Sequence, residues 1–145
     1  MIGLPARRFR CLFALLCCLP AVTVIAEDDD KSRIDGAWRL VGQLTDSGEI
    51  RETGGRAVKF IMGGQWCVTA WDPNSGQVVY HHGGTYTFDG QKHTENVKYV
   101  APIRSAGNLG NTYQFNIEFS GKRLTQRGIG NPYNEVWERL QAEKE

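Results

Sequence analysis

The sequence is short of cysteine over most of its length. Of the four cysteines in 145 residues, three lie within the first 18 residues, and Cys67 alone remains beyond them. If the N-terminal part is removed, no intrachain disulfide can form. We interpret Cys67, which lies between Trp66 and Val68, as a small buried hydrophobe rather than a nucleophile.

The sequence also lacks an excess of charge of one sign. It has 17 Lys and Arg residues against 16 Asp and Glu residues, so the formal net charge is +1. Loss of residues 1–26, which hold three arginines and no acidic residue, changes the balance to 14 − 16 = −2. Neither value supports binding to nucleic acid, or binding to a membrane surface through a cluster of basic residues. The sequence therefore predicts no nucleic-acid partner.

A long apolar stretch occurs only at the N-terminus. Residues 12–25 form this run, a basic segment with three arginines precedes it, and residues 24–26 offer a cleavage site before Glu27. This three-part form is typical of a secretory signal. The run is shorter than the roughly 20 residues that a spanning helix needs. We predict a signal peptide over residues 1–26, a secreted or periplasmic protein, and no integral membrane segment after cleavage.

What remains after the signal is one domain's worth of chain. Residues 27–33 carry a dense run of charges, which we interpret as a solvated linker rather than a metal site. Cleavage would leave 145 − 26 = 119 residues, enough for one modest core. We therefore predict a single domain over residues 34–145.

Helical periodicity is missing from this domain, apart from a frayed tail expected over residues 141–145. Apolar residues recur instead with a period of two, and turns rich in Gly, Asn and Asp separate the segments, which indicates an all-β fold. The expected strands are residues 37–44, 57–62, 65–71, 77–88 with a kink at 83–84, 93–100, 112–119, 122–127 and 134–140. Eight strands joined by short connections predict an antiparallel up-and-down meander that closes into a barrel and so removes its exposed edges.

The central hairpin, residues 83–100, gives the clearest clue to a site. We predict a two-residue turn at Asp89-Gly90, which would place Phe88 opposite Gln91, Tyr86 opposite His93, and Gly84 opposite Glu95. The inward face would then carry Tyr86, Phe88, His93, Glu95, Val97 and Tyr99. This face is apolar but holds a carboxylate and two phenols, a mixture that favours the wall of a cavity over a dry core.

Motifs at the start, in the middle and at the end of the domain resemble those of a known family. Gly36-Ala37-Trp38 resembles the Gly-x-Trp motif of lipocalins, and the central hairpin together with residues 135–139 resembles the short lipocalin-like domains of uncharacterised secreted bacterial proteins. The resemblance covers residues 34–140. It implies an up-and-down calycin-type barrel, non-enzymatic in most relatives, with a small apolar ligand in the cup.

The same resemblance implies structural roles for two residues. Lipocalins place an arginine of the last strand over the tryptophan of the first motif, so Arg139 would lie over Trp38. The sequence departs from the family in having no Thr-Asp-Tyr motif, no disulfide and no long C-terminal helix.

Glu95 is the most informative candidate, because an inward carboxylate without a partner is costly. It would either bind a ligand, with tyrosines as neighbours, or be satisfied internally by Arg139, a tyrosine hydroxyl or backbone N–H groups near Gly84. The predicted ligand-binding residues are Tyr86, His93, Glu95, Tyr99, Phe115 and Gln126.

Patterns for metal binding and catalysis are weak. His81 and His82 are adjacent in a strand and point to opposite faces, and no residues complete a site with His82 and His93. We predict no metal, no cofactor and no catalytic residue.

Three functions follow in order of preference. The first is binding of a small, mainly apolar ligand inside the barrel. The second is a protein-interaction module with a solid-packed barrel, which an outward-facing Trp137 would favour. The third is a calycin-type enzyme that uses Tyr86, His93 and Glu95 for acid–base chemistry.

Overall fold

The computed structural model describes residues 33–141, without the side chain of Arg104, so the predicted signal peptide and most of the predicted tail lie outside the described residues. The elements are β1 (Gly36–Leu44), β2 (Ile50–Glu52), β3 (Ala57–Met62), β4 (Gln65–Trp71), β5 (Val78–Phe88), β6 (Lys92–Ala101), the 3₁₀-helix η1 (Ile103–Asn108), β7 (Thr112–Ser120), β8 (Arg123–Gly128) and β9 (Glu135–Arg139).

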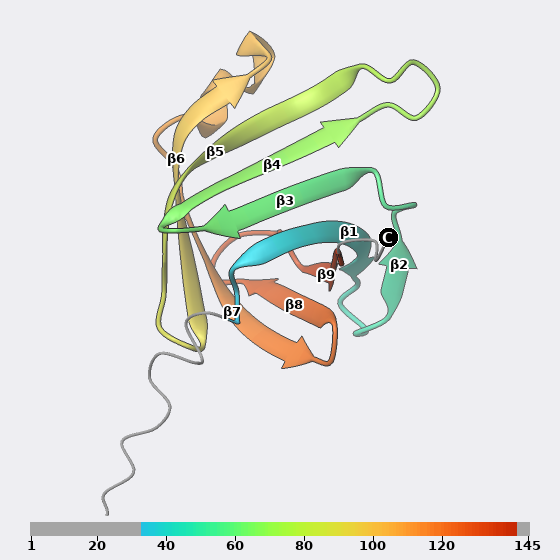
Figure 1. Cartoon of the computed structure of the whole chain (residues 1–145), viewed down its shortest axis with the longest axis vertical. Helices are drawn as coiled ribbons and strands as arrows, with labels where there is room; N and C mark the ends of the chain where they lie inside the picture. Colours follow the sequence, from blue (N-terminus) through green and yellow to red (C-terminus); the bar gives the residue numbers. More distant parts are fainter. Residues whose placement is uncertain (1–32, 142–145) are drawn as a thin grey trace, which may run out of the picture.

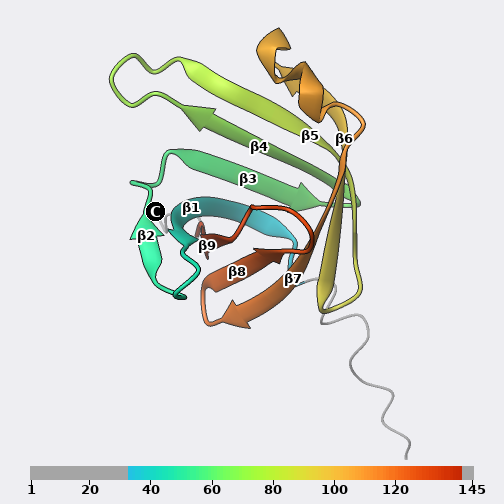
Figure 2. The same cartoon turned by 180° about the vertical axis from the view of Figure 1, so that it is seen from behind.

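Eight of these strands form a closed antiparallel barrel. Each strand from β3 to β8 pairs with the next along the chain, and β1 pairs with both β3 and β9, which completes the circle. Figures 1 and 2 show the strands curling around one interior, with η1 at the end of β6. The predicted eight-stranded up-and-down barrel is confirmed.

The interior is built from alternate side chains of successive strands, as period-two patterning requires. Trp38 and Leu40 of β1, Phe115 and Ile117 of β7, and Leu124 of β8 belong to one buried cluster. The faces of β3 and β4, both of which carry large apolar residues, divide in the same way. Ala57 and Ile61 are buried, whereas Phe60 and Met62 point outward and are 50% and 74% exposed.

Two elements were not predicted. β2 lies between the expected strands 37–44 and 57–62, and its three residues are exposed while they pair with the end of β1. The 3₁₀-helix η1 begins after Pro102 and has no side-chain cap. Both are short and carry no periodic apolar pattern, so nothing in the sequence predicts them.

The turn of the central hairpin is longer than predicted. Phe88 pairs with His93 and Tyr86 pairs with Glu95, so four residues lie between the last paired residues of β5 and β6, and the predicted two-residue turn at Asp89-Gly90 is wrong. The side chain of Asp89 explains this loop, because its Oδ1 accepts hydrogen bonds from the backbone N–H groups of Gln91 (3.0 Å) and Lys92 (2.6 Å). The register error is two residues, so the side chains between the turn and Val97 keep their predicted faces.

A β-bulge lies where the Gly83-Gly84 pair predicted a kink. Gly83 pairs with Tyr99 and Gly84 pairs with Val97, which leaves Lys98 as an extra residue on β6. Figure 1 shows β5 changing direction along its length. The extra residue reverses the alternation of β6, so Tyr99 is 44% exposed and stacks on His81 outside the barrel. The predicted inward position of Tyr99 is therefore wrong.

Cys67 is also placed differently from the prediction. It is only partly buried, whereas its neighbours Trp66 and Val68 are buried in the core. It lies on the outer side of β4, because adjacent strand residues point to opposite faces.

One end of the barrel is closed by the pair that the family resemblance implied. The Arg139 guanidinium lies 4.1 Å from the centre of the Trp38 ring. Arg139 also donates hydrogen bonds to the carbonyl oxygens of Asp35 (2.6 Å) and Arg33, and Trp38 Nε1 donates to the carbonyl oxygen of Ile34 (2.9 Å). These bonds fasten the segment before β1 across the end of the barrel. Within residues 33–141 no helix is both long and apolar enough to cross a membrane.

Candidate functional site

The barrel contains a cavity of about 340 Å³ toward the end opposite the Arg139–Trp38 pair. All eight strands of the barrel line it, together with Ser105 and Asn108 of η1 and Tyr133 of the loop before β9. This volume lies at the lower end of the range of about 300–1,000 Å³ for small-molecule sites. The interior is therefore hollow at one end and packed solid at the other.

Aromatic side chains make up much of the cavity wall. The lining includes Trp66, Tyr80, Tyr113, Phe115, Tyr133 and Trp137. Trp137 is only 1% exposed, so it lies on the inward face of β9 and not on the outer surface. The ring of Tyr113 meets that of Tyr133 edge to face, with centroids 5.3 Å apart. These rings give the cavity a large apolar surface with hydroxyl groups at several points.

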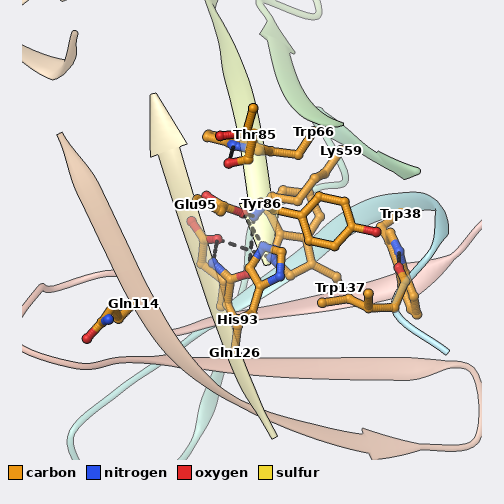
Figure 3. Close-up of polar contacts among 12 residues, drawn as sticks. Trp38, Lys59, Trp66, Thr85, Tyr86, His93, Glu95, Gln114, Gln126 and Trp137 are labelled. Carbon is orange, nitrogen blue, oxygen red and sulfur yellow. Dashed lines mark hydrogen bonds and ion pairs between the residues drawn. The ribbon is translucent and has the colours of Figure 1, made fainter. Parts of the chain in front are cut away.

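A buried ion pair lies against this wall. Lys59 Nζ is 2.8 Å from Glu95 Oε1, and His93 Nε2 is 3.0 Å from the same oxygen (Figure 3). All three side chains are almost completely buried, and β3 and β6 bring them together from distant parts of the sequence. His93 Nδ1 has no hydrogen-bond partner among the described residues. An ionised carboxylate can only accept a hydrogen bond, so the His93 Nε2–H donates to Glu95.

Gln126 connects the ion pair to a second carboxylate. Lys59 Nζ donates to Gln126 Oε1 (3.1 Å), and Gln126 Nε2 donates to Glu135 Oε2 (2.9 Å). Trp137 Nε1 donates to the same oxygen of Glu135 at 3.1 Å. The orientation of the Gln126 amide is thus fixed at both ends, because an ammonium can only donate and a carboxylate can only accept.

The two carboxyl groups have opposite pKa shifts. Burial raises the pKa of Glu95, but the charge of Lys59 and the hydrogen bond from His93 outweigh it and bring the pKa to about 2. Burial also raises the pKa of Glu135, where Lys59 is farther away and opposes it only in part. Glu95 is therefore firmly ionised, whereas the charge on Glu135 is poorly compensated.

His82 lies on the cavity wall as a neutral group. Burial lowers its pKa, and Lys59 adds to that effect. Its ring stacks on Tyr80 and meets Trp66 edge to face. Its Nδ1 is buried without a hydrogen-bond partner in the described part of the chain.

The structure separates the predicted ligand-binding residues. Glu95, Phe115 and Gln126 line the cavity. His93 lies behind Glu95, with its ring packed among those of Tyr86, Phe88 and Phe115.

Tyr86 points to the closed end, where its hydroxyl donates to Asp35, and Tyr99 is outside the barrel. The predicted grouping of Tyr86 and Tyr99 around Glu95 is therefore wrong.

Sequence reasoning missed Lys59 and Glu135. Glu95 is satisfied by Lys59 and His93, whereas Arg139, which had been considered as its partner, lies at the closed end. The available signal was the alternation of β3, in which Lys59 shares a face with Ala57 and Ile61. Glu135 shares its face with Trp137 in the same way.

No group of three or more His, Cys, Asp and Glu residues in the described chain is placed to hold a metal ion. Four polar side chains of the cavity, Lys59, Glu95, Gln126 and Glu135, are joined by hydrogen bonds.

Comparison with solved structures decides the fold. A lipocalin-like protein from Bacteroides uniformis superimposes with a TM-score of 0.57 over 77% of this chain and 99% of its own, at 13% sequence identity. The fold is lipocalin-like. An uncharacterised protein from Bacteroides eggerthii resembles this lipocalin-like barrel with a TM-score of 0.54, over 73% of this chain and 98% of its own, also at 13% identity.

No protein-family model matches the sequence, and comparison with curated proteins finds no significant match. At this level of identity the likeness establishes the fold alone, so a function must be argued from the cavity.

Proposed function

We propose that this protein binds a small molecule inside the barrel. The observation that carries the proposal is the cavity of about 340 Å³ with convergent polar groups at Lys59, Glu95, Gln126 and Glu135. A barrel of eight strands leaves just enough room for one small ligand. Concave sites with a mostly aromatic wall and a few fixed polar groups are typical of small-molecule binding.

The ligand is small and mainly apolar, with a polar group at one end. Its apolar part would lie against the rings of Trp66, Phe115 and Trp137, which line the cavity. Its polar part would meet the connected groups around Gln126. Hydrogen-bonding groups fixed in advance cost little ordering on binding, which favours affinity.

We also propose a secreted or periplasmic location. The support is the sequence of residues 1–26, which has a basic segment, an apolar run and a small-residue cleavage site. Detection of the mature N-terminus at Glu27 in the exported fraction would test it.

The alternative of a solid-packed interaction module is less well supported. It depended on a filled interior and an outward-facing Trp137, whereas the barrel holds a cavity and Trp137 lines it. An acid–base site of Tyr86, His93 and Glu95 is also disfavoured, because Tyr86 and His93 do not line the cavity.

The direct test is native mass spectrometry of protein purified from its own host, followed by thermal-shift screening with a broad library of small molecules. We expect a co-purified mass or a set of stabilising compounds. Val68→Trp, which fills the cavity, should abolish both effects. Met62→Trp adds the same ring at a position 74% exposed and should leave them unchanged. No bound mass and no stabilising compound would refute the proposal.

A further inference from the structure

The charges around the cavity do not balance. Lys59 is the one cation among its described lining residues, and it forms its ion pair with Glu95 at 2.8 Å. Glu135 also lines the cavity, and no described cation lies within ion-pair distance of it. With His82 neutral, the described lining carries one positive and two negative groups.

Glu135 presents an unused acceptor to the cavity. Its two hydrogen-bond donors, Gln126 Nε2 and Trp137 Nε1, are neutral and both bind Oε2. No described group donates to Oε1. A carboxylate has about four acceptor positions on its two oxygens, so Glu135 retains capacity for a donor that enters the cavity.

The surroundings of Glu135 favour a cation further. Tyr80 and Tyr133 line the same cavity, and the charge of Glu135 adds to the effect of burial in raising their pKa values. Trp66, Phe115 and Trp137 present further aromatic surface to the cavity. The faces of aromatic rings carry negative potential and attract organic cations.

An anionic ligand fits these groups poorly. Lys59 already donates to Glu95 and Gln126, so an incoming carboxylate or phosphate would have to compete with Glu95 for the ammonium group. It would also lie near two carboxyl groups, and like charges at close range disfavour each other strongly where water is excluded.

We propose that the ligand is a small organic ammonium ion with an aromatic or alicyclic body, and that its cationic group pairs with Glu135. This inference rests on the proposed function, that the cavity binds a small molecule, and names the ligand class. The bound amine supplies the counter-charge that Glu135 lacks, while its body lies on the aromatic wall. The raised pKa of Glu135 agrees with a carboxyl group that has no cation of its own.

The test compares ligands that differ only in charge. Calorimetric titration of the purified protein would use 2-phenylethylamine, tryptamine and cyclohexylmethylamine, each beside its neutral alcohol and its carboxylate of similar length. We expect each amine that binds to do so at least about tenfold more tightly than its alcohol, since a charge-assisted hydrogen bond replaces a neutral one. The carboxylates should bind more weakly than the alcohols.

A variant pair assigns the preference to one side chain. Glu135→Gln should reduce the affinity for the amine by about tenfold or more and leave the affinity for the alcohol within about twofold. Glu138→Gln is the matched control, because Glu138 is three residues along the same strand and faces Arg39 and Arg123 on the outside. It should leave both affinities unchanged.

The outcomes separate this inference from the proposed function. Alcohols or carboxylates that bind as tightly as the amines, or a preference for amines that survives Glu135→Gln, would overturn the ammonium assignment and leave ligand binding intact. No binding by any amine would also overturn the assignment. A co-purified mass would still sustain the proposed function in that case, and absence of any bound species would refute both.

Discussion

Lys59 points into the barrel interior from β3, whose other inward side chains are apolar. The ion pair with Glu95 offsets the cost of burying its charge. The two atoms Nζ and Oε1 are 2.8 Å apart, and both side chains are almost fully buried. Removing one member of such a pair leaves an uncompensated charge, whereas removing both can be neutral.

The first prediction concerns this pair. Glu95→Gln should lower the free energy of unfolding by about 3–5 kcal/mol, because the Lys59 ammonium would lose its counter-charge. The measurement is urea denaturation followed by tryptophan fluorescence. The double variant with Lys59→Met should recover much of the loss. If the double variant is as unstable as the sum of the two single ones, the pair is not coupled and the interpretation fails.

The second prediction is a pH dependence of opposite sign for the two carboxyl groups. The folded-state pKa of Glu95 is about 2 against an ordinary 4.5, so its stabilising contribution is complete above 4.5 and disappears as the pH falls toward 2. The folded-state pKa of Glu135 is raised, so the contribution of this group to the stability of the folded protein is complete below pH 4.5. That contribution is lost as the pH rises through the raised pKa.

Glu135→Gln should therefore stabilise the protein relative to wild type as the pH is raised from 4.5 to neutral. Urea unfolding at several pH values measures this difference. A difference between wild type and Glu135→Gln that stays constant over this range would contradict the prediction. Glu95→Gln serves as the control, since its deficit should shrink as the pH falls.

At the residue scale, the sequence predicted the positions of Glu95, Phe115 and Gln126 on the cavity wall because all three lie on strands with clear alternation. Lys59 was missed because both faces of β3 carry large apolar residues, so the pattern could not say which face was inside. A lysine on such a strand ordinarily faces water. Its interior position depends on Glu95, which is 36 residues away in the sequence.

At the scale of elements, the bulge between β5 and β6 controls which side chains reach the interior. A Cβ atom added at Gly84 would overlap the carbonyl oxygen of Asn96 and lie 2.8 Å from the backbone N of Lys98. Both obstacles are backbone atoms of the paired strand, so they cannot move aside as a side chain could.

The third prediction follows from this close approach. Gly84→Ala should lower the stability by about 1–3 kcal/mol or more, as expected when extra volume is forced into a packed region. Thermal and urea denaturation provide the measurement. Gly107→Ala is the control, because a Cβ atom there meets nothing within 4 Å. Equal stability of the two variants would show that the bulge accommodates a side chain.

The glycine pair predicted a bend, and the bend is there, but its effect on β6 was not predictable. A bulge can place the extra residue on either strand, and only the pairing of Gly83 with Tyr99 reveals that it lies on β6. Tyr99 was assigned inward by uninterrupted alternation, which the extra Lys98 breaks. The connection at Asp89 was not predictable either. The Asp89 side chain accepts hydrogen bonds from the backbone N–H groups of Gln91 and Lys92, and these bonds stabilise a longer connection than the expected two-residue turn.

At the scale of the whole molecule, closure depends on β1 and β9 meeting. The sequence predicted closure because a closed barrel removes the exposed edge strands that an open meander would have. The lipocalin resemblance implied the contact of Arg139 with Trp38. Whether the interior was hollow could not be predicted, because cavity volume depends on how side chains from all eight strands fill the space.

The fourth prediction tests the closed end. Arg139→Ala removes the interaction with the Trp38 ring, worth about 0.5–2 kcal/mol, and the hydrogen bonds to the carbonyls of Asp35 and Arg33. Hydrogen–deuterium exchange should become faster in residues 33–38 and in β9. The cavity lies toward the other end, so ligand affinity should change little. Unchanged exchange in these segments would show that Arg139 does not fasten them.

Because the first and last strands are paired neighbours, the described chain ends side by side, and the Leu140 N–H donates to the Ala37 carbonyl at 2.8 Å. A short linker could join these ends, and new termini could open at the tight Gly63-Gly64 turn between β3 and β4. Such a circularly permuted chain would begin and end at the turn between β3 and β4 without removing any strand from the ring. The order in which the strands are synthesised is thus separable from the order in which they are arranged in space.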